Sequence, residues 1–256
     1  MREIKFKICD YLREATIEGN IIKLPSGQLA REEYMQVKKK LEGIGGKWKG
    51  GKTYGFIFDV NPEKLLKEII EGNNINLKKD FQYFATPKKI ADKLVYYADI
   101  QNHDTILEPS AGQGAIIKAI NKYSDIRPDC YELMEQNRII LKENPEVYFK
   151  LIGNDFLRSE SKEYSKIIAN PPFTKNQDIE HIYKMFERLG NGGRLVSIAS
   201  NHWKQSQNKK ETNFRNWLDK HNAEIVEIES GEFKESGTNI SCCIIIINKE
   251  VVAGSN

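Results

Sequence analysis

The sequence predicts an α/β fold preceded by a smaller α+β module, and three observations support this. Residues 105–117 show a short apolar run, a turn with two glycines and the start of an amphipathic helix, which together predict a strand-turn-helix unit. Residues 167–169 form a second apolar run, which ends at an Asn-Pro-Pro-Phe string. Residues 1–78 differ from the rest, because a glycine-rich basic segment lies there between two helical stretches.

The turn of the first unit has the composition of a nucleotide-binding loop. Gly112 and Gly114 allow the backbone to approach a ligand closely, and the following helix begins with free N–H groups. The third glycine of the dinucleotide fingerprint is missing, and so is the Gly-Lys-Ser/Thr end of a P-loop. A phosphate is therefore not the expected ligand of this loop.

Two further strand ends carry residues that suit an adenosine-type ligand. Residues 129–131 predict a strand that leads to Glu132, and an acid in that place accepts hydrogen bonds from ribose hydroxyls. Residues 147–152 predict the next strand, which leads to Asp155 and Phe156, an acceptor for an adenine amino group and a ring that stacks on it. Taken singly, Glu132 could be a solvated charge and Asp155 a helix N-cap. Taken in chain order, they predict an adenosine-type cofactor across the sheet.

The string Asn170, Pro171, Pro172 and Phe173 suits methylation of a planar exocyclic amine. The lone pair of such an amine is delocalised into its ring, so the nitrogen must be activated. The Asn170 side-chain oxygen and the Pro171 carbonyl can each accept one N–H bond of the amine and localise the lone pair, while Phe173 stacks on the ring. The alternative is a strand-ending turn in which Phe173 packs inward.

Residues 107–114 and 170–173 together resemble the S-adenosylmethionine-dependent amino-methyltransferases, and most closely the gamma-type DNA adenine-N6 methyltransferases. The resemblance extends over residues 81–248, including a Thr-Pro segment at 84–88 and a loop at 231–240 that leads to the last strand. It implies a Rossmann-like class I methyltransferase domain with a seven-stranded mixed sheet over residues 79–250. It also implies S-adenosyl-L-methionine as the cofactor.

The resemblance implies a role for each matching residue. The residues implied to line the cofactor are Thr86, Glu108, Pro109, Ala111 and Gly112 at its methionine side, Glu132 at its ribose, and Asp155 and Phe156 at its adenine. The implied catalytic residues are Asn170, Pro171, Pro172 and Phe173, with Phe233 as a second aromatic face for the flipped base. Relatives of this type usually carry a target-recognition domain after the last strand, and this sequence ends at Asn256. Recognition is therefore expected to come from residues 1–78, from a separate specificity partner or from a homodimer.

Positive charge is concentrated in the first 80 residues, which hold 16 Lys and Arg against 12 Asp and Glu, while the remainder holds 23 against 24. Residues 37–58 predict a helix end followed by a glycine-rich hairpin that carries Lys47, Trp48, Lys49 and Lys52. Cations interleaved with aromatics suit a phosphate backbone with a base beside it. The alternative is a solvated hairpin in which Trp48 packs on neighbouring aromatics.

A second polar stretch, residues 201–215, follows the predicted fifth strand. It contains Trp203, Lys204, Lys209, Lys210 and Arg215, which could cover DNA as a loop that becomes ordered on binding. The alternative is a flexible surface insertion.

Composition and motifs argue against several other classes. No apolar run is long enough to span a bilayer and no signal peptide is recognisable, so a cytoplasmic protein is expected. The 4 cysteines lack zinc spacing, and Cys242 and Cys243 are expected to be small core residues. The 4 histidines form no cluster and no Gly-x-Ser-x-Gly turn is present, so neither a metal site nor a hydrolase is predicted. His181 is expected to be a partly exposed helix residue, and the alternative is a contact with the cofactor or the substrate.

The function expected from these residues is that of a DNA adenine-N6 methyltransferase acting on a base flipped out of the duplex. The same Asn-Pro-Pro-aromatic string occurs in enzymes that methylate cytosine N4, guanine N2 of ribosomal RNA or a glutamine side chain. An RNA or cytosine-N4 amino-methyltransferase is therefore an alternative, and the basic N-terminal module argues against the glutamine substrate. A nucleic-acid-binding module with a degenerate methyltransferase fold is a further alternative.

Overall fold

The computed structural model describes residues 2–27, 29–58, 61–72, 85–160, 162–229, 231–233 and 241–251, with the backbone alone for residues 2–7. The chain divides into two compact units, Met1–Tyr83 and Phe84–Asn256. The boundary expected near residue 78 and most of the loop expected at 231–240 lie outside the described residues. Within the described ranges, no helix is long and apolar enough to cross a membrane.

The first unit combines helices with a four-stranded antiparallel sheet in the order β1-β2-β4-β3. Its elements are α1 (Arg2–Arg13), β1 (Thr16–Glu18), β2 (Ile21–Lys23), α2 (Arg31–Gly43), β3 (Lys47–Lys49), β4 (Gly55–Ile57) and α3 (Glu63–Ile70). Leu12, Ile22, Leu41 and Phe56 are fully buried, so side chains from the helices and the sheet form one small core.

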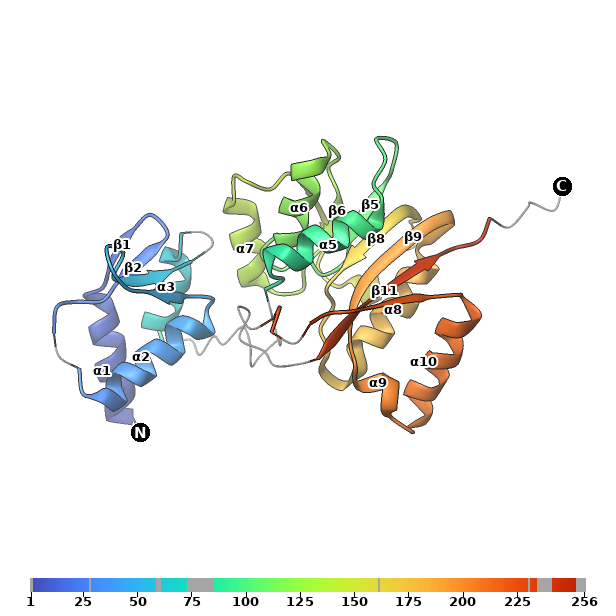
Figure 1. Cartoon of the computed structure of the whole chain (residues 1–256). Coiled ribbons are helices and arrows are strands. Elements are labelled where there is room, and N and C mark those ends of the chain that lie inside the picture. The colour runs from blue at the N-terminus through green and yellow to red at the C-terminus, as the bar shows by residue number, and fades with distance from the viewer. Residues whose placement is uncertain are drawn as a thin grey trace. The chain divides into compact units, whose positions relative to one another are not determined.

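The second unit is a seven-stranded sheet with helices on both faces (Figure 1). Its elements are α5 (Lys88–Ala98), β5 (Ile106–Glu108), α6 (Ala115–Tyr123), β6 (Asp129–Tyr131), α7 (Glu135–Glu143), β7 (Lys150–Gly153), η1 (Phe156–Arg158), β8 (Tyr164–Ala169), η2 (Thr174–Asn176), α8 (Gln177–Glu187), β9 (Leu189–Ser200), α9 (His202–Gln205), α10 (Lys209–Lys220), β10 (Glu224–Glu227) and β11 (Cys242–Asn248). The strand order is β10-β11-β9-β8-β5-β6-β7, and β11 is antiparallel to both of its neighbours. This confirms the predicted α/β fold and its seven-stranded mixed sheet.

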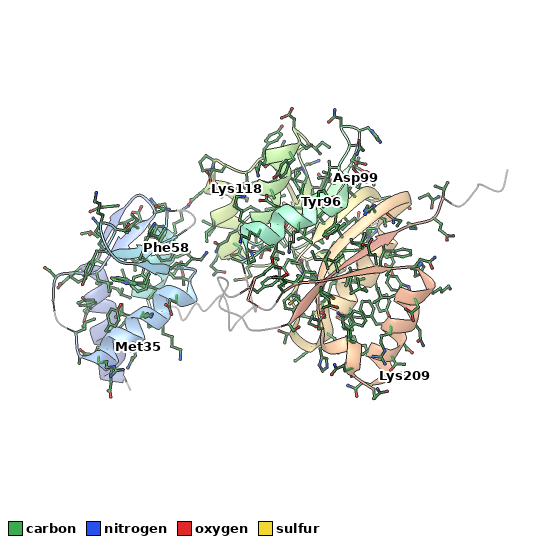
Figure 2. All side chains as sticks on the ribbon, in the orientation of Figure 1. Met35, Phe58, Tyr96, Asp99, Lys118 and Lys209 are labelled. Carbon is green, nitrogen blue, oxygen red and sulfur yellow. The ribbon has the colours of Figure 1, made fainter. Side chains whose placement is uncertain are left out.

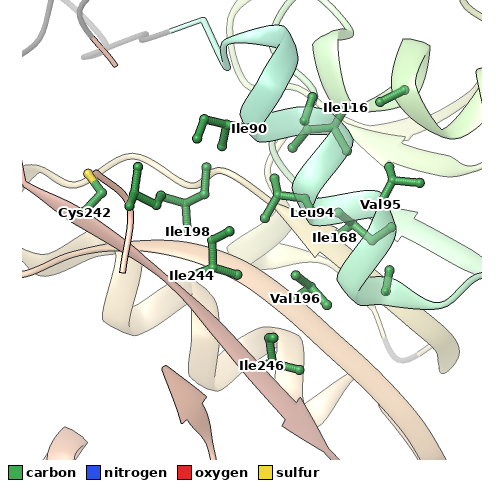
Figure 3. Packing of buried hydrophobic residues seen from close by; sticks show 14 of the residues in the cluster. Ile90, Leu94, Val95, Ile116, Ile168, Val196, Ile198, Cys242, Ile244 and Ile246 are labelled. Carbon is green, nitrogen blue, oxygen red and sulfur yellow. The ribbon is translucent and has the colours of Figure 1, made fainter. Parts of the chain in front are cut away.

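Alternation along the central strands builds an apolar layer on each face of the sheet. Ile244 and Ile246 of β11 pack with α5 and α6, as Figure 3 shows for one face. Cys243 and Ile245 point the other way and pack with α8 and α10. A strand covered on both faces reads as a continuous apolar run, which is why β11 is so apolar. The expectation that Cys242 and Cys243 are core residues is confirmed, and burial raises the pKa of both thiols to about 12.

Two local expectations differ from the structure. The third strand predicted at 147–152 is present but has other bounds, since β7 runs from Lys150 to Gly153 and Val147 takes part in a turn closed on Asn144. The polar stretch at 201–215 is neither a loop nor a flexible insertion, because it contains α9 and most of α10. Trp203, Phe214 and Leu218 bury one side of this helical segment against the sheet.

Candidate active site

The candidate site lies at the point in the sheet from which successive strands are added on opposite sides. From β5 the chain continues outward through β6 and β7, whereas β8 and β9 lie on the other side of β5. The neighbours β5 and β8 are parallel, with Leu107 opposite Ile167. Ligands of open α/β sheets bind beyond the carboxyl ends of the strands at such a switch point. Glu108, the last residue of β5, and Asn170, the first residue after β8, therefore lie at the same edge of the sheet.

The glycine turn after β5 is fixed to the end of β6. Gly112 and Gly114 both have left-handed backbones, with φ of 56° and 89°. The Gly112 N–H donates to the Glu132 carboxylate at 2.6 Å, and the Ala111 N–H donates to the Tyr131 carbonyl at 2.9 Å. A Cβ at Gly114 would lie 2.8 Å from Leu141 Cδ1, so this glycine is required by packing as well as by its φ.

Glu132 is buried and holds this turn in place through hydrogen bonds. Its carboxylate accepts hydrogen bonds from Gly112, from the Met134 N–H at 2.8 Å and from the Asn137 amide at 3.3 Å. Burial raises the pKa of Glu132, and these hydrogen bonds act in the opposite direction. The alternative of a solvated strand-end charge is therefore wrong. Each carboxylate oxygen has two lone pairs, so the predicted contact with ribose hydroxyls is compatible with these bonds.

Glu108 provides a second buried carboxyl group at the same site. It is only 1% exposed, and burial together with the charge of Glu132 holds its pKa well above the ordinary value, opposed by a hydrogen bond from the Ile117 backbone. Its Oε2 accepts no hydrogen bond from the described part of the chain. Two neighbouring buried carboxyls favour a cationic ligand, because a cation relieves both the repulsion and the desolvation. S-adenosyl-L-methionine carries a sulfonium and an ammonium group, so this donor set fits it.

Asn170 follows β8 and contacts a residue from a distant part of the chain. Its Nδ2 donates to the Thr86 hydroxyl at 3.0 Å, across 84 residues of sequence. Thr86 precedes α5 and was expected beside the methionine part of the cofactor. The structure thus places a residue predicted for the cofactor within one hydrogen bond of a residue predicted for the amine. This bond also orients the Asn170 amide, whose oxygen is the predicted acceptor.

Of the three residues that follow Asn170 in the chain, Pro171 and Phe173 are buried and Pro172 is half-buried. Phe173 is 8% exposed and belongs to the same apolar cluster as Phe233 and Ile90. Both aromatic residues predicted to stack on a base are therefore part of the apolar layer on one face of the sheet. Little of either ring is exposed, so stacking would require the surrounding residues to move.

Asp155 and Phe156 follow β7. Asp155 accepts a hydrogen bond from the Leu157 N–H at 3.0 Å and caps η1, in agreement with the N-cap alternative. Its side chain remains about one-third exposed and can still accept a further donor. Phe156 is buried, with its ring centroid 6.0 Å from that of His181.

His181 was expected to be partly exposed, and this is wrong. The residue is buried, and its Nδ1 donates to the Gln177 carbonyl at 2.8 Å, so the ring is fixed along α8. Burial lowers the pKa of His181, which favours the neutral imidazole.

Sequence reasoning missed Leu133. This residue directly follows Glu132 at the carboxyl end of β6 and is 60% exposed, although it is large and apolar. An exposed apolar side chain beside a ligand site offers a surface for a planar ring. In the sequence, Leu133 stands out as an apolar residue directly after the strand-end acid Glu132, in a place where a polar turn residue is more usual.

The predicted basic hairpin is present in the first unit. Lys47, Lys49 and Lys52 are exposed and form no ion pair with any residue whose placement is described. Trp48 packs edge-on against Tyr54 and Phe56, with centroids 5.3 and 5.1 Å away, as the alternative expected. It is nevertheless 37% exposed, and Tyr54 is 72% exposed, so aromatic surface and free cations are presented together.

The cations of the 201–215 stretch are mostly engaged within the protein. Lys204 pairs with Glu227, Lys210 pairs with Glu180 at 2.7 Å, and Arg215 donates to backbone carbonyls including that of Ser206. Trp203 is buried. This stretch therefore does not form a DNA-covering loop, which was one of the two interpretations of the sequence. Elsewhere in the described ranges, no group of three or more His, Cys, Asp or Glu is arranged to hold a metal ion.

Comparison with known proteins gives no matching family model. A curated relative, an rRNA adenine N-6-methyltransferase of Bacteroides fragilis, is 31% identical over 122 residues, which cover 45% of this chain. The chain spans 44% of the length of that relative.

Solved structures resemble the chain over most of its length. The M protein of the type I restriction enzyme EcoKI matches 100% of this chain and 62% of its own, with a TM-score of 0.57 and 14% identity. A candidate class I S-adenosylmethionine-dependent methyltransferase of Listeria monocytogenes matches 98% of this chain and 82% of its own, with a TM-score of 0.55 and 12% identity. The chain thus has the fold of the class I S-adenosylmethionine-dependent methyltransferases, which supports S-adenosyl-L-methionine as its cofactor.

Proposed function

We propose that this protein is an adenine-N6 methyltransferase that transfers the methyl group of S-adenosyl-L-methionine to a flipped adenine in DNA. The observation that carries the proposal is the hydrogen bond between Asn170 and Thr86 at the switch point of the sheet. It joins the predicted amine site to Thr86, which is predicted to line the cofactor together with the buried Glu108 and Glu132. Methyl transfer requires a methyl donor and an amine to be held at such a junction.

The predicted methyl transfer depends more on activation of the amine nitrogen than on a strong base. The Asn170 oxygen and the Pro171 carbonyl would accept the two N–H bonds of the adenine amino group and localise its lone pair. When bound, S-adenosyl-L-methionine supplies an electrophilic methyl group. The amine becomes acidic only once the N–C bond has formed, so its proton can leave to water. The residues predicted to hold the cofactor are Thr86, Glu108, Pro109, Ala111, Gly112, Glu132, Asp155 and Phe156, joined in our proposal by Leu133.

The DNA substrate is supported by the first unit. Its hairpin presents Lys47, Lys49 and Lys52 beside exposed Trp48 and Tyr54, a combination that suits a nucleic-acid backbone. Base flipping costs a few kcal/mol, which stacking and backbone contacts can offset. A modification subunit of a candidate type I restriction enzyme from Vibrio vulnificus is also similar, with a TM-score of 0.53 over 95% of this chain and 14% identity. We therefore propose that a separate specificity subunit or a second copy assists recognition, in the cytoplasm.

RNA is the second candidate, because the Bacteroides fragilis relative is an rRNA methyltransferase. A candidate RNA methyltransferase of Pyrococcus horikoshii shares the fold at a TM-score of 0.50 and 19% identity. The amine chemistry would be the same in either nucleic acid, whereas the contacts outside the base would differ.

The test is to incubate the purified protein with methyl-labelled S-adenosyl-L-methionine and, separately, unmethylated bacterial DNA, total RNA and ribosomal protein. After digestion, we expect the label in N6-methyladenine from DNA, and Asn170→Ala should abolish it. Label in RNA or protein alone would overturn the substrate and retain the chemistry. No label in any substrate, with cofactor binding intact, would favour a missing partner or a non-catalytic module.

A further inference from the structure

The loop after Phe173 has an unusual backbone that the amine chemistry alone does not explain. Lys175 and Asn176 are consecutive non-glycine residues with left-handed backbones, at φ of 54° and 60°. Such conformations are unfavourable for L-residues and persist only where the surroundings hold them. The pair reverses the chain between Phe173 and the start of α8 at Gln177.

A buried carboxylate from α10 holds this reversal. The Asn176 amide donates to Glu211 Oε1 at 2.9 Å, across 35 residues of sequence. The same oxygen receives the Asn208 amide at 3.4 Å and lies 3.5 Å from His202 Nε2. Figure 2 shows where α10 begins, at the labelled Lys209. Glu211 lies in the first turn of that helix, where the helix dipole favours a carboxylate.

The surroundings of Glu211 favour its ionised form. Its side chain is 2% exposed, and burial alone would raise the pKa of Glu211. Hydrogen bonds from its own backbone, from Asn176 and from Asn208 outweigh burial and lower this pKa, so the carboxylate is available as an acceptor for Asn176.

The two ends of the loop are fixed separately. At one end, Asn170 continues β8 and bonds to Thr86. At the other end, the buried Asp178 of α8 accepts hydrogen bonds from both the backbone N–H and the hydroxyl of Ser200, each at 2.9 Å. The contact between Asn176 and Glu211 lies between these anchors, at the reversal itself.

We propose that Glu211 is a positioning residue for the amine-activating loop, acting through Asn176. By holding the left-handed turn, it fixes the direction in which the chain leaves Phe173 and thereby the placement of the Asn170 oxygen and the Pro171 carbonyl. This inference rests on the proposed function, because it assigns the loop to amine activation. Small displacements of positioned groups have large effects on rate.

The test compares Glu211→Ala, Glu211→Gln and a matched control, Glu180→Ala. The control removes the Lys210–Glu180 ion pair, which also joins α10 to α8 but does not contact the loop. Methylation of unmethylated DNA is measured as kcat and KM, and backbone hydrogen exchange of residues 170–177 is measured without substrate.

We expect Glu211→Ala to lower kcat about tenfold to a hundredfold, with the KM for S-adenosyl-L-methionine within about twofold of wild type. Glu211→Gln keeps an acceptor for Asn176 and should retain most of kcat. The control should leave kcat and loop exchange unchanged, whereas Glu211→Ala should accelerate exchange of the loop. Unchanged kcat and exchange in Glu211→Ala, or equal effects in the control, would overturn the proposal.

Asn176→Gly serves if Glu211→Ala does not fold. Glycine adopts the left-handed backbone without strain, so this variant removes only the side-chain bond. It should lower kcat as Glu211→Ala does, and combining it with Glu211→Gln should add little, because both act through one hydrogen bond. Wild-type kcat in Asn176→Gly would refute the proposal. If the wild-type protein methylates nothing, the proposed function fails, and the exchange measurement still decides whether Glu211 holds the loop.

Discussion

Gly114→Ala tests whether the glycine turn is held by packing as the structure indicates. The added Cβ would meet Leu141 Cδ1 at 2.8 Å and Val147 Cγ1 at 3.1 Å, in a cluster that is already buried. Leu141 can move only by changing rotamer within this cluster, and Val147 is β-branched and stiff. The substitution also forces a non-glycine residue to φ 89°.

The two effects can be added. A left-handed backbone costs an L-residue about 1–2 kcal/mol, and overpacking of one methyl group costs about 1–3 kcal/mol. Because Leu141 can yield at its flexible end, the lower part of the second range applies, which gives a loss of about 2–4 kcal/mol in the free energy of unfolding. With about 1.4 kcal/mol for each factor of ten, this equals roughly a 30-fold to several-hundred-fold loss in the equilibrium constant for folding.

Native-state hydrogen exchange is the suitable assay, because it reports on each unit of the chain separately. Amides of α6 and β5 should lose protection by this factor in Gly114→Ala. Gly190→Ala is the matched control, since its Cβ would meet nothing closer than 3.5 Å and its φ is not left-handed. Protection within about 0.5 kcal/mol of wild type in Gly114→Ala, or an equal loss in the control, would refute the reasoning.

Three further predictions concern the site. Asn170→Ala should lower turnover about 10²–10³-fold and leave the calorimetric affinity for S-adenosyl-L-methionine unchanged; equal losses in both would show that Asn170 is structural. Replacing Lys47, Lys49 and Lys52 by Ala should weaken DNA binding and reduce the slope of log K against log salt by about 2–3, because each phosphate that a lysine neutralises adds about 0.9 to that slope; an unchanged slope would make the hairpin a solvated edge. The pKa of Glu108 is raised by burial from an ordinary value of 4.5, so the folded protein binds the extra proton, and ligand-free stability should fall as pH rises from that value through the raised one. Glu108→Gln should reduce this slope in urea unfolding followed over pH and leave the part that comes from the raised pKa of Glu132; an identical slope would assign it to another group.

The sequence by itself determined the α/β fold, because its signals are local. A strand covered on both faces must be continuously apolar, as β11 is, and a tight turn that leads into a helix needs glycine, as at Gly112 and Gly114. The prolines after Asn170 end β8 for an equally local reason, since they donate no backbone hydrogen bond. These patterns were sufficient to predict the α/β class, and the resemblance that they carry implied the seven-stranded sheet, which the structure confirms.

Tertiary structure alone decided how the site is supported. The α9–α10 segment was read as a loop because it is polar, and its burial against the sheet depends on a few residues such as Trp203 and Phe214 that reveal little in sequence. The apolar cluster that buries Phe173 and Phe233 likewise draws on elements that are distant in the chain. Hydrogen bonds between residues far apart, such as Asn176 with Glu211 and Asn170 with Thr86, leave no periodic signal. Their partners are chosen by the packing of whole elements, which single-sequence patterns do not encode.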